Sequence, residues 1–404
     1  MEAQKNSASN LQSRQRRDDP QASRSSEGAP QSSGGAPQAL RIAIAGGGTG
    51  GHLFPGIAIA QEFMARDHQN EIIFVSTGNA LEKRILSKLN YVLECITVEG
   101  IKSRGLWKQF KSVCKLPKGI FDAFRILRRF KPHLIVGLGS YSAGPVVLVA
   151  RLLGLKVVLC EQNLLPGITN RLLSRFADMI FISFEDSRSH FAANKVRFTG
   201  NPVRQDIMTD RATAEPEGGL EHGPKPFTVL IIGGSQGAHR INETVTEALN
   251  LLHRKEDLYF IHQTGAADEN MVKNAYAQHG VSSIVQAFFD SMAGHYQNAD
   301  LIVCRAGATT VAEITALGKA SLFIPFPYAA DDHQALNAGS LTKNGAAEMI
   351  LEKDLTAEVL AEKIDHYAGH PEALAEMAQK AKSFGNPNAA ADIVDSCYQL
   401  LAQN

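Results

Sequence analysis

The sequence predicts an α/β fold of two doubly wound domains, each built on a parallel sheet, with a ligand cleft between them. The chain has 404 residues, 44% of them hydrophobic, which is enough for two domains with separate cores. Short apolar runs alternate with helical patterns in both halves. Each half also opens with an apolar run and a glycine-rich turn, at Gly46–His52 and Gly233–Gly237. Ligands of such sheets bind beyond the carboxyl ends of the strands, so both turns should face the cleft.

The first half should contain a tail and one domain. Residues 1–40 are mainly Ser, Gln, Gly, Pro, Ala and Arg, a composition typical of a disordered tail. The N-terminal domain is expected over residues 41–200, with helices such as Phe54–Arg66 and Ile168–Phe176. Its predicted strands are Ile42–Ala45, Ile72–Ser76, Val92–Val98, Leu134–Gly137, Val157–Cys160, Met179–Ser183 and Lys195–Thr199.

The second half should follow a linker. Residues 201–226 hold four prolines among glycine and charged residues, which favours a linker. The C-terminal domain is expected over residues 227–404, and it should be helical from Asp354 onward. Its predicted strands are Thr228–Ile232, Leu258–His262, Ser283–Ala287, Leu301–Cys304 and Ala320–Ile324.

The glycine turns indicate sites for phosphate groups. Glycine lets the backbone turn sharply, and a helix start offers unpaired N–H groups to an anion. Neither turn is a Walker loop, and neither gives a regular dinucleotide fingerprint.

Composition narrows the function further. Lys and Arg together number 41, as do Asp and Glu, so net charge does not favour nucleic acid as a partner. The five cysteines are scattered, as expected for reduced thiols in the cytoplasm. No apolar stretch is long enough to cross a membrane, and no secretory signal is evident at the N-terminus.

A third strand–turn–helix pattern places Glu313 one turn into a helix. A carboxylate there is often only a stabilising charge near the helix start, but it could also accept two ribose hydroxyls. The loop Asp331–Gln334, followed by Asn337, suits sugar hydroxyls. A metal site at Asp331, Asp332 and His333 is the less favoured reading, because no characteristic ligand spacing occurs. No cofactor is expected, although a divalent cation stays open.

Several motifs in order along the chain resemble those of the MurG family. These bacterial glycosyltransferases add N-acetylglucosamine (GlcNAc) to undecaprenyl-diphosphate-linked muramyl pentapeptide, converting lipid I to lipid II in peptidoglycan synthesis. The matching motifs are the glycine run with His52, Glu161-Gln162-Asn163, Gly200–Arg204, Gly233–Ala238, Arg305–Glu313, and His333-Gln334 with Asn337. The resemblance implies the two-Rossmann-domain architecture called GT-B, UDP-GlcNAc as donor, and inversion at the anomeric carbon. It also implies a location at the cytoplasmic face of the bacterial inner membrane.

The resemblance implies a set of residues that contact UDP-GlcNAc. Ser235 and the following N–H groups would hold the diphosphate, Arg204 would stabilise the leaving UDP, and Glu313 would accept the ribose hydroxyls. The backbone at Phe289 would meet uracil, and Gln334 would bind GlcNAc hydroxyls. The whole set is Thr49, Gly50, Gly51, Asn163, Arg204, Ser235, Phe289, Ala308, Thr309, Thr310, Val311, Ala312, Glu313 and Gln334. Two departures from the family pattern are Cys160 for the usual His and Ser140 for the usual Gly.

His52 is the predicted general base, because imidazole titrates near neutral pH and this one ends the first glycine run. The alternative is a capping or packing role. Residues Ile101–Lys131 combine ten Lys or Arg with Trp107, Phe110, Phe121 and Phe124. A solvated helix face is the default for such a run. Together with a lipid acceptor, however, the pattern predicts contact with an anionic membrane surface.

Two other functions stay open. The chain could be another sugar-nucleotide enzyme of the same fold, such as a glycolipid glycosyltransferase or a UDP-GlcNAc 2-epimerase. Such an enzyme would have the same two glycine-rich turns. A non-catalytic nucleotide-binding module would bind UDP without turnover.

Overall fold

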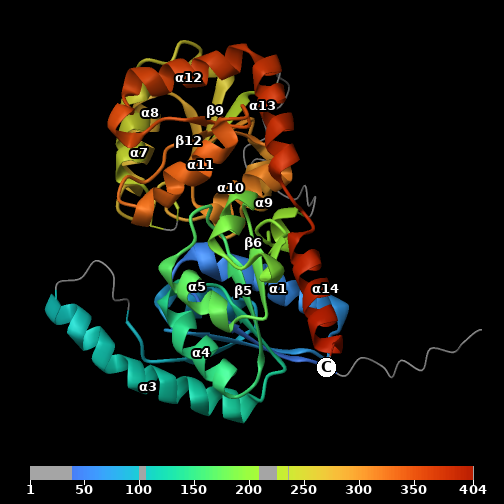
Figure 1. The fold of residues 1–404 in the computed structure, drawn as a ribbon. Coiled ribbons are helices and arrows are strands. Elements are labelled where there is room, and N and C mark those ends of the chain that lie inside the picture. Colours follow the sequence, from blue (N-terminus) through green and yellow to red (C-terminus); the bar gives the residue numbers. More distant parts are fainter. Residues whose placement is uncertain (1–38, 100–105, 209–224, 235, 404) are drawn as a thin grey trace, which may run out of the picture. The chain divides into compact units, whose positions relative to one another are not determined.

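The computed structural model describes residues 39–99, 106–208, 225–234 and 236–403, without the side chains of residues 106–115. Nearly all of the predicted tail therefore lies outside the described residues. Residues Ala39–Asn404 form one compact unit. Two parallel sheets organise this unit (Figure 1). The predicted α/β class with two doubly wound sheets is confirmed.

The first sheet has the strand order β3-β2-β1-β4-β5-β6-β7, and every neighbouring pair is parallel. β-Branched and aliphatic residues fill the central strands, which are buried on both faces, as parallel sheets require. The strands are β1 (Arg41–Ala45), β2 (Glu71–Ser76), β3 (Val92–Cys95), β4 (Leu134–Gly137), β5 (Lys156–Glu161), β6 (Met179–Ile182) and β7 (Val196–Phe198).

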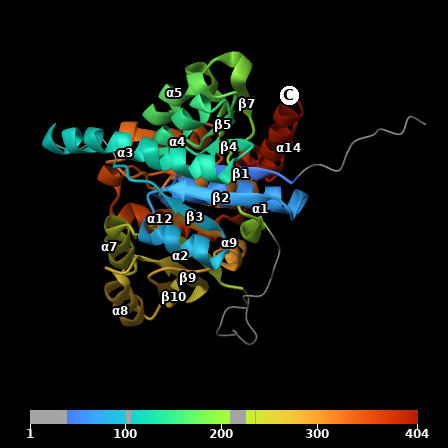
Figure 2. The ribbon, with the colours of Figure 1, turned by 90° about the horizontal axis from the view of Figure 1, so that it is seen from below.

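Helices cover both faces of this first sheet. One face packs against α3 (Leu106–Phe130), α4 (Ser140–Leu152) and α5 (Ile168–Leu173). Figure 2 shows these three helices together on one side of the strands. The other face packs against α1 (Gly50–Arg66), α2 (Ala80–Lys88) and α14 (Ala389–Ala402). We call this sheet and its six helices the first lobe.

The second sheet has the order β10-β9-β8-β11-β12-β13, and its strands are also parallel. With its covering helices it forms the second lobe. The strands are β8 (Phe227–Ile232), β9 (Leu258–Gln263), β10 (Ser282–Gln286), β11 (Leu301–Cys304), β12 (Ala320–Phe323) and β13 (Glu348–Met349). The helices are α6 (Gln205–Met208), α7 (His239–Ala248), α8 (Glu269–His279), α9 (Ala293–Asn298), α10 (Ala308–Leu317), α11 (His333–Thr342), α12 (Ala357–Gly369) and α13 (Pro371–Phe384).

The structure differs from the predicted elements in several places, and α1, for example, begins at Gly50 and not at Phe54. The expected strand Val92–Val98 ends at Cys95, because its neighbour β2 ends at Ser76. The short strand β13 was not predicted, since two residues carry no periodicity. Val203 and Ile207, at the start of the predicted linker, are buried in the core of the second lobe, and the limits of the linker stay a prediction.

The last helix, α14, returns to the first lobe. Its residues Ile393, Val394 and Cys397 are fully buried there, in the cluster that also holds Phe63 of α1. The domain limits inferred from the sequence stay predictions. They assign α14 to the C-terminal domain, although this helix packs against the first lobe.

Candidate active site

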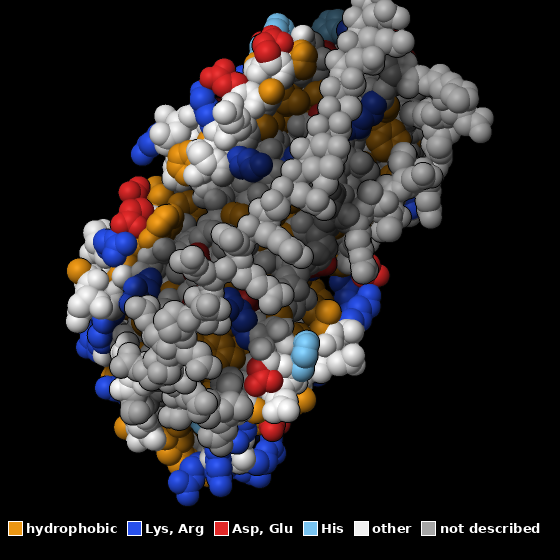
Figure 3. Space-filling model, turned by 90° about the vertical axis from the view of Figure 1, so that its right-hand side faces the viewer, with side chains coloured by type: hydrophobic (Ala, Val, Ile, Leu, Met, Phe, Trp, Pro, Cys, Tyr) orange, Lys and Arg blue, Asp and Glu red, His pale blue; other side chains and the backbone are white. Residues whose placement is uncertain are grey.

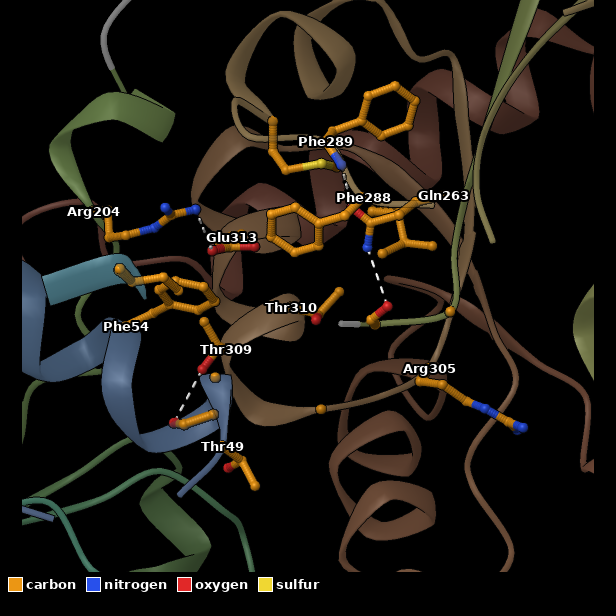
Figure 4. A pocket seen from close by; sticks show the side chains of 18 of the residues that line it. Thr49, Phe54, Arg204, Gln263, Phe288, Phe289, Arg305, Thr309, Thr310 and Glu313 are labelled. Atoms are coloured by element: carbon orange, nitrogen blue, oxygen red, sulfur yellow. Dashed lines mark hydrogen bonds and ion pairs between the residues drawn. The ribbon is translucent and has the colours of Figure 1, made fainter. Parts of the chain in front are cut away.

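A cavity of about 710 Å³ lies where the glycine turns of the two lobes meet. It is bounded by residues that follow the carboxyl ends of β1, β8 and β11, as expected for doubly wound sheets. Figure 4 shows Thr49 and Phe54 of the first lobe opposite Thr309, Thr310 and Glu313 of α10.

Most of the predicted donor-binding residues line this cavity. They are Thr49, Gly50, Gly51, Asn163, Arg204, Phe289, Thr309, Thr310, Glu313 and Gln334, together with the predicted base His52. Ala308, Val311 and Ala312 instead line a second cavity, of about 480 Å³. Ser235 lies outside the described residues, although Gly233, Gly234 and Gly237 around it line the main cavity.

The second glycine turn is tight on one side and open on the other. Gly237 has a φ of +82°, and a Cβ there would lie 2.0 Å from the Thr264 carbonyl oxygen. A Cβ on Gly234 would meet nothing within 4 Å. The turn leads into α7, a ten-residue helix whose N-cap residue Ala238 provides no side-chain hydrogen bond. This geometry suits a phosphate held by backbone N–H groups.

Glu313 is a buried carboxylate at the centre of the site. The Tyr296 hydroxyl donates to its Oε2 atom at 2.8 Å, and Arg204 Nη2 lies 3.8 Å from its Oε1 atom. The Arg204 guanidinium also stacks over the Phe54 ring, 4.3 Å from the centroid. Burial raises the pKa of Glu313, while Arg204 and the Tyr296 hydrogen bond oppose that rise. The arrangement places one acceptor group and one cation side by side at the cavity.

Gln263, at the end of β9, was missed by the sequence reasoning. Its Oε1 atom accepts a hydrogen bond from the Phe289 backbone N–H at 3.1 Å, and its Nε2 donates to the Gly234 carbonyl at 3.2 Å (Figure 4). One side chain therefore ties the predicted uracil-binding loop to the open glycine turn. No local motif marks it, because both partners are distant in the sequence.

Several contacts join the lobes around the cavity. Arg84 of α2 stacks over Phe288 at 4.5 Å, and Lys88 pairs with Asp290 at 3.1 Å. At another point Asn337 accepts from the Leu164 N–H at 3.0 Å and donates to Asn163 Oδ1 at 3.2 Å. The Thr309 hydroxyl donates to the Gly51 carbonyl at 3.2 Å. The last of these contacts holds the first turn of α1 against α10.

His52 lies on the first turn of α1 and faces the cavity. Its Nδ1 atom is 3.3 Å from the Thr49 hydroxyl, and a Cβ on Gly139 would lie 3.5 Å from its ring. Burial, and secondarily the nearby His333, lower the pKa of His52 to about 4. The imidazole is therefore neutral at neutral pH, the form that accepts a proton.

In the described part of the chain, no group of three or more His, Cys, Asp and Glu side chains could hold a metal ion. Asp331 and Asp332 both adopt left-handed backbone conformations, with φ of 53° and 51°. Among the residues that the structure describes, no helix is long and apolar enough to cross a bilayer.

Two parallel α/β lobes with a cavity at their facing strand ends form the GT-B fold. The family model of the glycosyltransferase family 28 N-terminal domain matches residues 42–182, and that of the family 28 C-terminal domain matches residues 228–393.

Individual proteins give a finer assignment. The chain is 46% identical to a UDP-N-acetylglucosamine–N-acetylmuramyl-(pentapeptide) pyrophosphoryl-undecaprenol N-acetylglucosamine transferase of Syntrophus aciditrophicus, over 90% of this chain and 99% of that one. It is 48% identical to the enzyme of the same name from Geobacter sulfurreducens, over 88% and 97%. The chain belongs to this family of N-acetylglucosamine transferases.

Solved structures agree with the fold. The crystal structure of Acinetobacter baumannii MurG has a TM-score of 0.69 and 33% identity, covering 89% of this chain and 99% of that one. A putative UDP-N-acetylglucosamine 2-epimerase from Listeria monocytogenes has a TM-score of 0.65 at 13% identity, covering 91% and 98%, a likeness that shows the fold alone.

Proposed function

We propose that the protein is an inverting glycosyltransferase that moves GlcNAc from UDP-GlcNAc to the 4-hydroxyl of undecaprenyl-diphosphate-linked N-acetylmuramyl-pentapeptide. The family and its GlcNAc transfer rest on identity of about 46% over 90% of the chain. The observation that carries the site assignment is the placement of the open second glycine turn, Arg204 and Glu313 around one cavity.

The donor is assigned mainly to the second lobe. The diphosphate lies on the turn that contains Ser235 and extends toward the start of α7. The Glu313 carboxylate accepts the ribose hydroxyls, and Arg204 moves from its 3.8 Å contact with Glu313 to the phosphates. Uracil lies by the backbone at Phe289, and Thr309, Thr310, Gln334 and Asn163 surround the GlcNAc.

The reaction is a single displacement at the anomeric carbon. The acceptor 4-hydroxyl attacks from the face opposite UDP, and His52 takes its proton. Negative charge grows on the departing UDP, where Arg204 and the backbone N–H groups of the turn stabilise it. His52 approaches from the first lobe and the diphosphate from the second, so the two groups act on opposite sides of the sugar.

The acceptor is membrane-bound, and we assign the membrane contact to Ile101–Lys131. In the described part of α3, Phe121 is 56% exposed and Phe124 is 42% exposed. Arg125 lies over the first ring at 6.0 Å and Arg128 over the second at 5.8 Å. Figure 3 shows Lys and Arg side chains gathered at the lower end of the face it draws, on the side of the first lobe. A surface of basic and aromatic side chains suits peripheral binding to anionic lipid.

The test is an assay that couples UDP release to the presence of the lipid acceptor. UDP release from UDP-GlcNAc only when the acceptor is present, together with a product one GlcNAc heavier, is expected. Formation of a 2-epimer would instead favour an epimerase, and UDP binding without turnover would favour a non-catalytic module.

A further inference from the structure

The first glycine turn already holds an anion, and that anion belongs to the protein. Glu82 of α2 is 1% exposed. Its Oε1 atom accepts from the Gly48 N–H at 2.6 Å and from the Ser76 hydroxyl at 2.6 Å. Its Oε2 atom accepts from the Asn79 N–H at 2.9 Å. Three donors converge on one buried carboxylate, as they would on a bound phosphate.

The turn is built around this carboxylate. A Cβ on Gly47 would lie only 2.1 Å from Glu82 Oε1, so glycine at 47 is required by the internal side chain. Asn79 closes the arrangement, because it donates to the Gly48 carbonyl at 3.0 Å and accepts from the Glu82 N–H at 3.0 Å. The Gly47 N–H points to the Ser140 hydroxyl at 3.4 Å. The N–H groups of both Gly47 and Gly48 are thus engaged within the protein.

Ser140, the departure from the family's usual glycine, belongs to the same network. It has a φ of 62°, a conformation that costs a non-glycine residue free energy. Its hydroxyl lies 2.8 Å from the Ser142 hydroxyl, which lies 3.5 Å from that of Ser76. A chain of hydroxyls therefore connects the start of α4, at Ser140, to the Glu82 carboxylate.

We propose that Glu82 is a positioning residue that closes the N–H groups at Gly47 and Gly48 to phosphate and fixes Thr49 and His52 at the cavity. The inference rests on the proposed function, because it assigns Glu82 to the same transfer reaction.

The test compares Glu82→Ala, Glu82→Gln and the control Glu62→Ala, whose side chain pairs with Arg66 at 2.7 Å outside the cavity. Misplacing Thr49 and His52 should lower the kcat of both Glu82 variants by about 10- to 100-fold. The Kd for UDP, measured by calorimetry, should stay within about threefold of the wild type, because UDP lies on the second lobe. The control should match the wild type in both quantities.

Rescue of kcat by added formate distinguishes positioning by the Glu82 carboxylate from a purely structural role of the side chain. Glu82→Ala leaves a carboxylate-sized space with three unpaired donors, so added formate should bind there and raise kcat severalfold, with no effect on the control. Binding of ¹³C-formate, followed by NMR, reads the same space without catalysis. Lack of formate binding by a folded Glu82→Ala would overturn the proposal, as would an unchanged kcat in Glu82→Gln, which keeps the shape if the alanine variant does not fold. If the wild type itself transferred no GlcNAc, the proposed function would be wrong. The NMR measurement of formate binding would still test the role of Glu82, because it does not depend on catalysis.

Discussion

The Thr309 hydroxyl donates a hydrogen bond to the Gly51 carbonyl, 3.2 Å away on the other lobe. Gly51 lies on the first turn of α1, four residues before Pro55. A helical carbonyl normally accepts from the residue four positions later, but proline has no N–H. Pro55 therefore leaves the Gly51 carbonyl available, and Thr309 uses it to join the lobes.

This relationship predicts a coupling between Thr309 and Pro55. Thr309→Val should lower the free energy of unfolding by about 1 kcal/mol, the usual value of one hydrogen bond. Pro55→Ala restores an N–H donor to the Gly51 carbonyl, so Thr309→Val should cost less in that background. A double-mutant cycle by chemical denaturation measures the difference. Strictly additive effects would show that the two residues act independently.

Removing Arg204 should impair both the reaction and the fold of the site. Arg204→Ala should lower kcat by about 10²- to 10³-fold, because charge on the departing UDP loses its stabilising cation. It also leaves the buried Glu313 carboxylate without its cation, so the pKa of Glu313 should rise further. Steady-state kinetics should be compared with Arg151→Ala, an arginine that is 51% exposed and pairs with Asp178. Wild-type kinetics in Arg204→Ala would remove Arg204 from the mechanism.

The low pKa of His52 predicts an unusual pH profile. Burial, and secondarily His333, lower that pKa to about 4, so the acidic limb of kcat/KM should lie near pH 4 and not near 6.5. His333→Gln removes the neighbouring ring and should shift the limb to higher pH. His52→Ala should reduce turnover by about 10²- to 10⁴-fold at all pH values. A limb near pH 6.5 that persists in His52→Ala would identify a different base.

Buried His262 predicts how stability depends on pH. Burial lowers its pKa to about 3, and its ring nitrogens lie 3.0 Å from Asn242 Oδ1 and 3.3 Å from the Tyr276 hydroxyl. Between pH 3 and about 6.5 the unfolded chain binds a proton that the folded chain does not, so stability falls as pH falls through this window. The group should contribute about 1.4 kcal/mol per pH unit there and no slope above it. Denaturation of His262→Gln at pH 4.5, 5.5 and 7.5 should show a correspondingly shallower slope.

The membrane assignment predicts two separable effects on vesicle binding. Reversing Lys108, Lys111, Lys115 and Lys118 to Glu should weaken sedimentation with anionic vesicles, because each charge contributes about 1 kcal/mol at the surface. Phe121→Ser with Phe124→Ser should reduce the part of binding that resists salt, which depends on apolar area. Transfer to a short water-soluble acceptor should survive both sets of changes. Equal sedimentation of the charge-reversed protein and the wild type at low salt would refute the assignment.

Local pattern was sufficient to predict most strands of the two sheets. Runs such as Thr228–Ile232 and Leu301–Cys304 are β-branched and apolar over a strand's length, so their strands appear almost where expected. The glycine turns could also be predicted from the sequence, because few other residues tolerate the positive φ angle at Gly237.

What the sequence could not supply are the partners that only folding brings together. The first turn reads as a phosphate site, yet the carboxylate that occupies it comes from Glu82, on another helix. Gln263 and Phe54 reach the cavity through tertiary packing and carry no motif. Burial itself changes the chemistry of His52, whose pKa falls far below the value assumed from residue type.

The return of α14 to the first lobe bears on how the protein is made. A ribosome makes the seven strands of the first sheet before the second lobe, but Ile393, Val394 and Cys397, which cover one face of that sheet, come after the second lobe. The nascent first lobe therefore carries an uncovered apolar strip during synthesis of the entire second lobe. Synthesis of α14, and not completion of the first lobe's own strands, sets the moment at which that lobe can close. A stop codon shortly before Ala389 would leave the second sheet intact but one face of the first sheet uncovered. Chaperones and proteases would then recognise the exposed apolar surface.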